Sequence, residues 1–158
     1  MKLLIKEKAF SWADTFTVKD EQGNDRWLVK GKPFSFGRKL HVMNVYGEEA
    51  ARIEQELFRF KRRYNVIVSG RQTASVVQEI TFFKPRFTVE GPGWDVQGNF
   101  WGHEFTVTEG GRTVVSISKE WFTWGDCYVL DIADGTDEMT ALAVVLSIDC
   151  MADQSSSS

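Results

Sequence analysis

Residues 136–151 read TDEMTALAVVLSIDCM, and this segment sets the architecture of the whole chain of 158 residues. The segment is apolar on nearly every side, and a helix without a polar face must be buried all round. It is too short to cross a bilayer, which takes about 20 apolar residues. The residues before it look almost entirely like β-strands, so we expect those strands to form a container around the helix.

Alternation of apolar and polar residues, bounded by Gly, Pro, Asn and Asp, predicts the strands that precede the helix. They are expected near residues 2–6, 15–19, 26–30, 39–45, 50–58, 63–69, 73–82, 86–90, 94–97, 103–108, 113–121 and 127–132. Eight strands leave room only for side chains and sixteen leave a water channel, whereas about twelve can enclose one helix. We therefore predict a mainly β protein, a closed barrel of about 12 strands around a buried C-terminal helix with Thr136 as its N-cap.

A diverged internal repeat supports this count. Phe16-Thr17-Val18 recurs as Phe87-Thr88-Val89, and Trp27–Gly31 recurs as Trp94–Gly98. Two further matches follow in the same order: Ile53–Phe58 with Ile117–Phe122, and Tyr64, Val66 and Val68 with Tyr128, Leu130 and Ile132. Four ordered matches indicate a duplication of a six-strand unit. The segment 48–58 looks helical by itself, but its β-branched counterpart 113–122 predicts that both are strands.

Composition and charge place limits on the class of protein. The length fits one domain, expected over residues 1–153 with a disordered, serine-rich tail at 154–158. Residues 1–70 hold 14 Lys/Arg against 9 Asp/Glu, whereas residues 71–158 hold 5 against 13. This division suggests one face suited to an anion, although two solvated surfaces of different charge would explain it equally well.

The cysteines and the N-terminus bear on the compartment. Cys127 and Cys150 are too few for a disulfide scaffold and lack metal-ligand spacing, so we expect two buried thiols. The N-terminus lacks the apolar core of a signal peptide. The expectation is a cytoplasmic protein, either free or peripheral to the membrane, with no cofactor and no transmembrane span.

Three segments resemble the LURP-one-related family: WLVKG at 27–31, FRFKRRY at 58–64 and ALAVVLSID at 141–149. The resemblance covers residues 1 to about 153. The family belongs with the tubby C-terminal domains and the phospholipid scramblases, and it implies a 12-stranded barrel around a hydrophobic C-terminal helix. It also implies a connection with lipids, because tubby domains bind phosphoinositides and scramblases act on bilayer lipids.

The basic segment is the strongest candidate for a ligand site. Its repeat counterpart is a predicted hairpin turn, so four cations gather at one tip beside Phe58, Phe60 and Tyr64. Arginine forks suit phosphate groups, and cations near an anionic membrane contribute about 1 kcal/mol each. A solvated turn is the alternative, and nucleic acid is not the expected partner. The candidate ligand residues are Arg59, Lys61, Arg62, Arg63, Lys30 and Lys32.

Other polar residues have simpler interpretations. Asp131, Asp134, Asp137 and Glu138 form a weak calcium candidate by resemblance to the Asp-rich segment of scramblases, but helix capping and turn chemistry explain them better. Asp149 interrupts the apolar helix and is expected near a barrel mouth or bonded to backbone N–H groups. His41 and His103 are expected to be ordinary strand or surface residues. The segment GPGWDVQGNFWG at 91–102 either covers the barrel wall or dips into a membrane surface.

These observations favour a non-enzymatic module that binds anionic phospholipid headgroups, or a similar phosphate-bearing ligand, at the membrane surface. A soluble protein-interaction or scaffold domain, with a protein partner and no lipid ligand, is the second hypothesis. An enzyme is the least supported, because the sequence contains no phosphate-binding loop, nucleophile elbow, zinc motif or paired acid and base.

Overall fold

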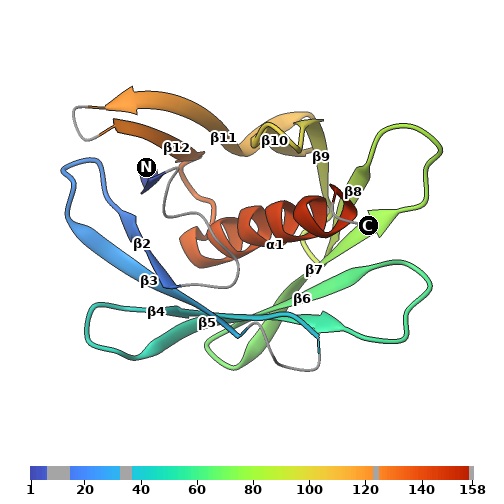
Figure 1. The fold of residues 1–158 in the computed structure, drawn as a ribbon, viewed down its shortest axis with the longest axis horizontal. Helices are drawn as coiled ribbons and strands as arrows, with labels where there is room; N and C mark the ends of the chain where they lie inside the picture. Colours follow the sequence, from blue (N-terminus) through green and yellow to red (C-terminus); the bar gives the residue numbers. More distant parts are fainter. Residues whose placement is uncertain (7–14, 33–36, 123–124, 157–158) are drawn as a thin grey trace.

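The structure is a computed structural model that describes residues 1–6, 15–32, 37–122 and 125–156. In these residues twelve antiparallel strands close into a barrel around one helix (Figure 1), which confirms the predicted fold class. Each strand pairs with its neighbours in sequence, and β1 pairs with β12 to close the ring. The strands are β1 Lys2–Lys6, β2 Thr15–Lys19, β3 Asp25–Lys32, β4 Lys39–Met43, β5 Glu49–Glu56, β6 Arg63–Val68, β7 Arg71–Glu79, β8 Arg86–Glu90, β9 Trp94–Asn99, β10 Glu104–Glu109, β11 Arg112–Phe122 and β12 Gly125–Ile132.

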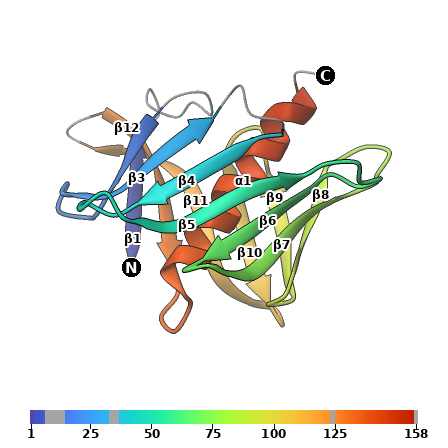
Figure 2. The same ribbon diagram turned by 90° about the horizontal axis from the view of Figure 1, so that it is seen from below.

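The helix α1, Glu138–Ser156, runs through the barrel (Figure 2). All residues from 139 to 152 are buried, as the apolar segment predicted. Asp137, not Thr136, is the N-cap, since its Oδ2 accepts a hydrogen bond from the Thr140 amide at 2.9 Å. The helix continues past residue 153, and Gln154 Oε1 accepts a 2.6 Å bond from the Tyr64 hydroxyl. Residues 154–156, assigned from sequence to the tail, are thus helical.

The sequence repeat maps onto strands that lie six positions apart. Its four matches fall on β2 with β8, β3 with β9, β5 with β11, and β6 with β12. Matched core positions are buried in both halves, as Ile53 and Ile117 illustrate. Most of the segment 48–58 that looked helical forms β5, Glu49–Glu56, so the repeat correctly predicted a strand there.

Several predicted strands end earlier than expected, two of them at the end of the barrel where α1 finishes. The segment 50–58 stops at Glu56, and the segment 73–82 stops at Glu79. Phe58 has a φ of 61°, a left-handed conformation that cannot continue a strand. Apolar residues prolong the alternation beyond both strands, but these side chains point to solvent instead of the core.

The two ends of the barrel differ in character. Tight polar turns join the strands at the end where α1 begins, for example Asp20–Asn24 and Asn44–Glu48. The loops at residues 57–62, 80–85 and 100–103 lie at the opposite end, where α1 finishes. We call this opposite end the helix C-terminal end. None of the described helical residues forms a segment long and apolar enough to cross a membrane.

Candidate functional site

Two loops lie side by side at the helix C-terminal end. They are residues 57–62, between β5 and β6, and residues 80–85, between β7 and β8. Strand pairing joins Arg63 to Val77, and the Gln78 amide donates a 2.9 Å hydrogen bond to the Arg62 carbonyl. We call these loops the tip pair. A hollow of about 470 Å³ lies at its base, lined by residues of both β-hairpins.

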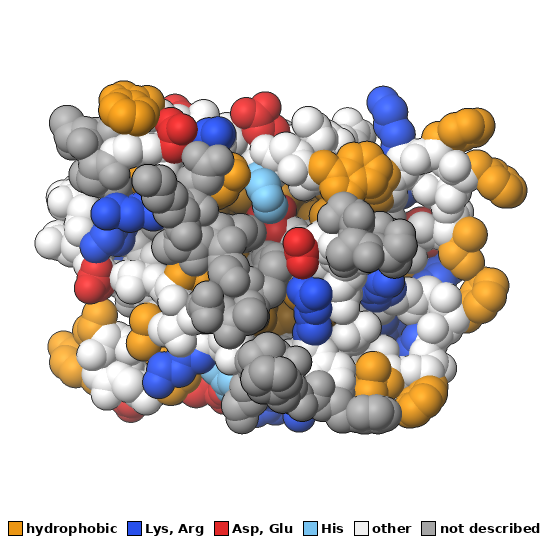
Figure 3. Space-filling model, viewed as in Figure 1, with side chains coloured by type: hydrophobic (Ala, Val, Ile, Leu, Met, Phe, Trp, Pro, Cys, Tyr) orange, Lys and Arg blue, Asp and Glu red, His pale blue; other side chains and the backbone are white. Residues whose placement is uncertain are grey.

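The tip pair carries a group of large apolar side chains that face solvent. Phe60 is 93% exposed and Phe82 is 99% exposed. Space-filling Figure 3 shows hydrophobic side chains gathered along the edge of the molecule where these loops project. Of the ten large hydrophobic side chains exposed in the described residues, seven lie at the helix C-terminal end. Five of these belong to the tip pair: Phe58, Phe60, Ile80, Phe82 and Phe83.

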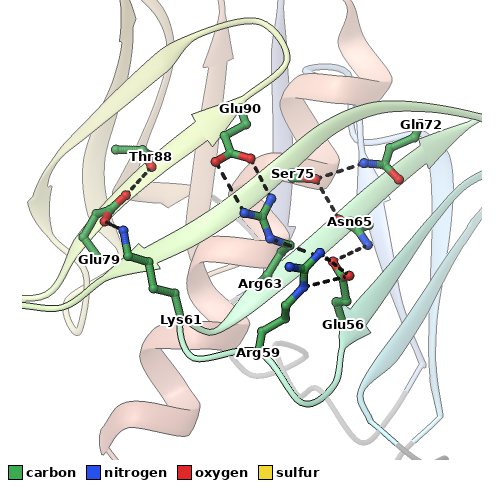
Figure 4. A network of polar contacts seen from close by, with 10 residues as sticks. All are labelled: Glu56, Arg59, Lys61, Arg63, Asn65, Gln72, Ser75, Glu79, Thr88 and Glu90. Carbon is green, nitrogen blue, oxygen red and sulfur yellow. Dashed lines mark hydrogen bonds and ion pairs between the residues drawn. The ribbon is translucent and has the colours of Figure 1, made fainter.

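The basic residues of segment 59–63 do lie together, but carboxylates compensate most of their charge (Figure 4). Three ion pairs bridge the segment to β5, β7 and β8: Arg59 with Glu56 at 2.7 Å, Lys61 with Glu79 at 2.5 Å, and Arg63 with Glu90 at 2.6 Å. Thr88 also donates a hydrogen bond to Glu79, at 2.9 Å. The cluster is therefore a network of paired charges and not an uncompensated cationic patch.

The pKa values of the three carboxyl groups follow from these contacts. The hydrogen bond from Arg59 lowers the pKa of Glu56, the bond from Lys61 lowers that of Glu79, and the bond from Arg63 lowers that of Glu90. All three carboxylates thus remain ionised at neutral pH and keep balancing the cations. An anionic ligand would have to compete with them for these cations.

The other three candidate cations, Arg62, Lys30 and Lys32, do not take part in these three ion pairs. Arg62 donates to Gln78 at 3.2 Å and to the Met151 carbonyl at 3.5 Å, which connects the tip pair to the end of α1. Lys30 lies on β3 opposite His41, with β4 and β5 between it and the basic segment, so it does not join the cluster. The backbone of Lys32 belongs to β3, and its side chain lies outside the described residues.

Two further cations at the second loop of the tip pair were not predicted from the sequence. Lys84 directly follows Phe83, Arg86 is the first residue of β8, and both are exposed. In the described part of the chain, neither forms an ion pair. The sequence pattern that could have indicated them is ITFFKPR at 80–86, in which aromatic residues precede a lysine, a proline and an arginine.

The core next to the tip pair contains one of the two cysteines. Cys127 and Cys150 are both buried, as predicted. The Cys150 sulfur lies 3.4 Å from the Tyr64 hydroxyl and 3.4 Å from an Arg38 guanidinium nitrogen. Burial raises the pKa of the Cys150 thiol and outweighs the opposite effect of these two contacts. The thiol therefore stays protonated and is a poor nucleophile.

Asp149 has a side-chain partner that sequence analysis did not identify. Its carboxylate is completely buried, and its Oδ1 lies 2.8 Å from His103 Nδ1. His103 sits in the turn before β10 with a φ of 55°, not within a strand as predicted. Burial raises the pKa of Asp149 to about 6, although the bond to His103 acts in the opposite direction. Asp149 Oδ2 is buried without a hydrogen-bond partner among the described residues.

Two of the four acidic residues of the calcium candidate, Asp137 and Glu138, are engaged by the protein itself. Glu138 accepts bonds from Arg26 at 2.7 Å and from the Trp27 indole at 2.6 Å. Asp137 caps the helix through Thr140. The described residues contain no group of three or more His, Cys, Asp or Glu side chains able to hold a metal ion.

Comparison with known proteins agrees with the fold. The family model described as LURP-one-related (LOR) matches residues 1–149, and the chain belongs to this family. A Bacillus subtilis (strain 168) protein named Uncharacterized protein YxjI is 35% identical over 150 residues, which cover 94% of this chain and 93% of that protein. The X-ray structure of an Arabidopsis thaliana protein has the same fold, with a TM-score of 0.66 and 16% identity over 96% of this chain and 90% of that one. These matches indicate no enzyme family.

Proposed function

We propose that this protein is a non-enzymatic binding module that docks on membrane surfaces containing anionic phospholipids, with the tip pair as its contact. The observation that carries the proposal is the group of five exposed apolar side chains on two adjacent loops, next to the exposed cations Lys84 and Arg86. Isolated exposed apolar residues are normal on protein surfaces, but a contiguous group rimmed by charge is typical of an interaction site.

The two contributions to binding have different sizes. Complete burial of one phenylalanine side chain contributes about 1.5–3 kcal/mol, and a lysine or arginine near an anionic surface contributes about 1 kcal/mol. The tip pair offers four phenylalanines, whereas its cations Arg59 and Lys61 and the adjoining Arg63 are already paired with glutamates. We therefore expect insertion of the aromatic rings to supply most of the affinity, and Lys84 and Arg86 to supply the preference for anionic lipid.

Co-sedimentation with phospholipid vesicles tests the proposal. The full chain should bind vesicles of mixed phosphatidylcholine and phosphatidylserine, and bind pure phosphatidylcholine more weakly. The double variant Phe82→Ser, Phe83→Ser should lose at least about tenfold in affinity for the mixed vesicles. Tyr46→Ser is the matched control, since Tyr46 is 85% exposed in a turn at the opposite end of the barrel.

Two outcomes would contradict the proposal. The first is the absence of wild-type binding to either kind of vesicle. The second is equal loss of binding in the tip and Tyr46 variants, which would exclude a specific role for the tip pair. If the chain captures a protein partner through Phe82 and Phe83 but binds no vesicle, the tip pair is a protein-interaction surface, as in the second hypothesis from sequence.

A further inference from the structure

A separate pocket opens beside the tip pair, where the barrel wall is incomplete. The ladder between β8 and β9 has two paired positions, Thr88 with Asp95 and Val89 with Trp94. Toward the helix C-terminal end the two strands separate, and β9 continues to pair with β10 as far as Asn99. The resulting pocket has a volume of about 460 Å³. Its lining consists of Lys84, Pro85, Val96, Gln97, Gly98, Asn99, Phe100 and Trp101.

The base of the pocket is apolar and firmly packed. Val96 and Phe100 are 5% and 4% exposed. The Phe100 ring packs against Phe87 at 4.8 Å and against Phe105 at 5.6 Å between ring centroids. Trp101 is half-exposed at the rim and adds a large amphipathic surface. Such a base suits an apolar or aliphatic part of a ligand.

The rim of the pocket offers polar groups suited to an anion. Lys84 is exposed, and it forms no ion pair with any residue that the structure describes. The Gln97 and Asn99 side chains add amide groups at the rim. Because alternate residues of a strand direct their backbone groups to opposite sides, part of the β9 backbone between 96 and 99 faces the gap and not β10. Backbone N–H groups and a lysine together are typical ligands of phosphate oxygens.

We propose that this pocket binds a single phospholipid molecule, with its phosphate at Lys84 and its glycerol and first acyl carbons against Phe100 and Trp101. The inference rests on the proposed membrane docking, which supplies the lipid. Lys84 follows Phe82 and Phe83 directly in sequence, so insertion of these rings brings the pocket mouth to the level of the headgroups. The volume lies within the range of pockets that enclose small ligands.

Titration with a short-chain lipid below its micellar concentration tests this pocket without a bilayer. Dihexanoyl phosphatidic acid is the probe, and amide shifts of Gly98, Asn99 and Gly102 in ¹H–¹⁵N spectra are the readout. We expect saturable shifts at these amides in the full chain. Lys84→Ala should weaken binding roughly tenfold, as loss of one charge-assisted contact implies. Trp101→Ala should weaken it as well.

The controls use residues of the same kind elsewhere on the surface. Arg112→Ala removes an exposed cation from the start of β11, and Trp121→Ala removes a 75% exposed indole from the end of β11. Both variants should bind the probe like the wild type. Dihexanoyl phosphatidylcholine should bind more weakly than dihexanoyl phosphatidic acid, because the choline ammonium of its headgroup compensates the phosphate charge. Glycerol 3-phosphate should bind more weakly still, because it lacks acyl carbons.

The outcomes separate this inference from the proposed function. Absence of saturable shifts, or unchanged affinity in Lys84→Ala, overturns the pocket even if the protein sediments with vesicles. Equal affinity for glycerol 3-phosphate and for dihexanoyl phosphatidic acid makes the pocket a phosphate site and overturns the lipid assignment. Saturable, Lys84-dependent shifts without sedimentation support the pocket and refute membrane docking.

Discussion

Replacement of Asp149 by asparagine should stabilise the protein, and by an amount that grows with pH. The carboxyl group is fully buried on α1, with His103 as its partner and one oxygen without a hydrogen bond in the described structure. Its pKa is raised from 3.8 to about 6, principally because burial disfavours the charged form. At 1.36 kcal/mol per pKa unit, this shift corresponds to about 3 kcal/mol.

The direction of the pH effect follows from the raised pKa. The neutral carboxyl contributes its stability fully below the unfolded pKa of 3.8, and this contribution is lost as pH rises through about 6. Asparagine does not titrate. The difference in unfolding free energy between Asp149→Asn and the wild type should therefore increase by about 3 kcal/mol across this interval and level off above it.

Urea unfolding in buffers from about pH 4 to about pH 8 measures this difference. Asp153→Asn is the control, because this aspartate lies one turn further along the helix with its side chain 51% exposed. A difference for Asp149→Asn that stays constant with pH would refute the reasoning. So would a difference that falls with pH, since that result would mean that His103 stabilises the ionised carboxylate more than burial destabilises it.

Three further predictions concern the barrel and its helix. Leu146→Ala should lower the unfolding free energy by about 3 kcal/mol in urea titrations, because this side chain is fully buried on α1; a loss below about 1 kcal/mol would contradict the enclosed helix. Glu138→Gln should cost about 2 kcal/mol at neutral pH. Hydrogen bonds from Arg26 and Trp27 outweigh burial and lower the pKa of Glu138, so this cost should shrink as pH falls through that pKa. Thermal melts at several pH values measure the cost, and a cost that does not change with pH would contradict the prediction. Gly98→Ala should lower the melting temperature, because its φ is 139° and an added Cβ would lie 2.5 Å from the Phe105 Cα; an unchanged melting temperature would contradict this close packing.

The architecture could be predicted because it depends on local patterns. Alternating residues define strands, and the segment around Leu142 and Leu146 has no polar face, so both signals are visible within short windows of sequence. The internal repeat added long-range information, and it identified segment 48–58 as a strand where local periodicity indicated a helix.

The candidate site was harder to predict, because its properties depend on contacts between distant residues. The basic segment was found, but Glu79 and Glu90 compensate Lys61 and Arg63 from other strands, at separations of 18 and 27 residues. The pairing of His103 with Asp149 joins a turn to a helix 46 residues away, and no motif signals it.

Exposed aromatic residues of the tip pair made two predicted strands too long. Phe58 and Phe82 extend the alternation that predicts a buried strand face, yet both rings project into solvent. Period-2 patterning cannot distinguish a ring that faces the core from one that faces water. The proposed membrane-contact site lies at these loops, where the pattern predicts buried rings and the structure has exposed ones.

Depth measurement by spin labelling tests the membrane-docking account most directly. Phe83→Cys places a label on the tip pair and Tyr46→Cys places one at the opposite end, while both native cysteines are buried. On vesicles containing phosphatidylserine, the label at position 83 should be accessible to oxygen and shielded from a water-soluble relaxant, whereas the label at position 46 should remain in water. Equal accessibility of both labels to the water-soluble relaxant, in a sample that co-sediments with the vesicles, would contradict the account.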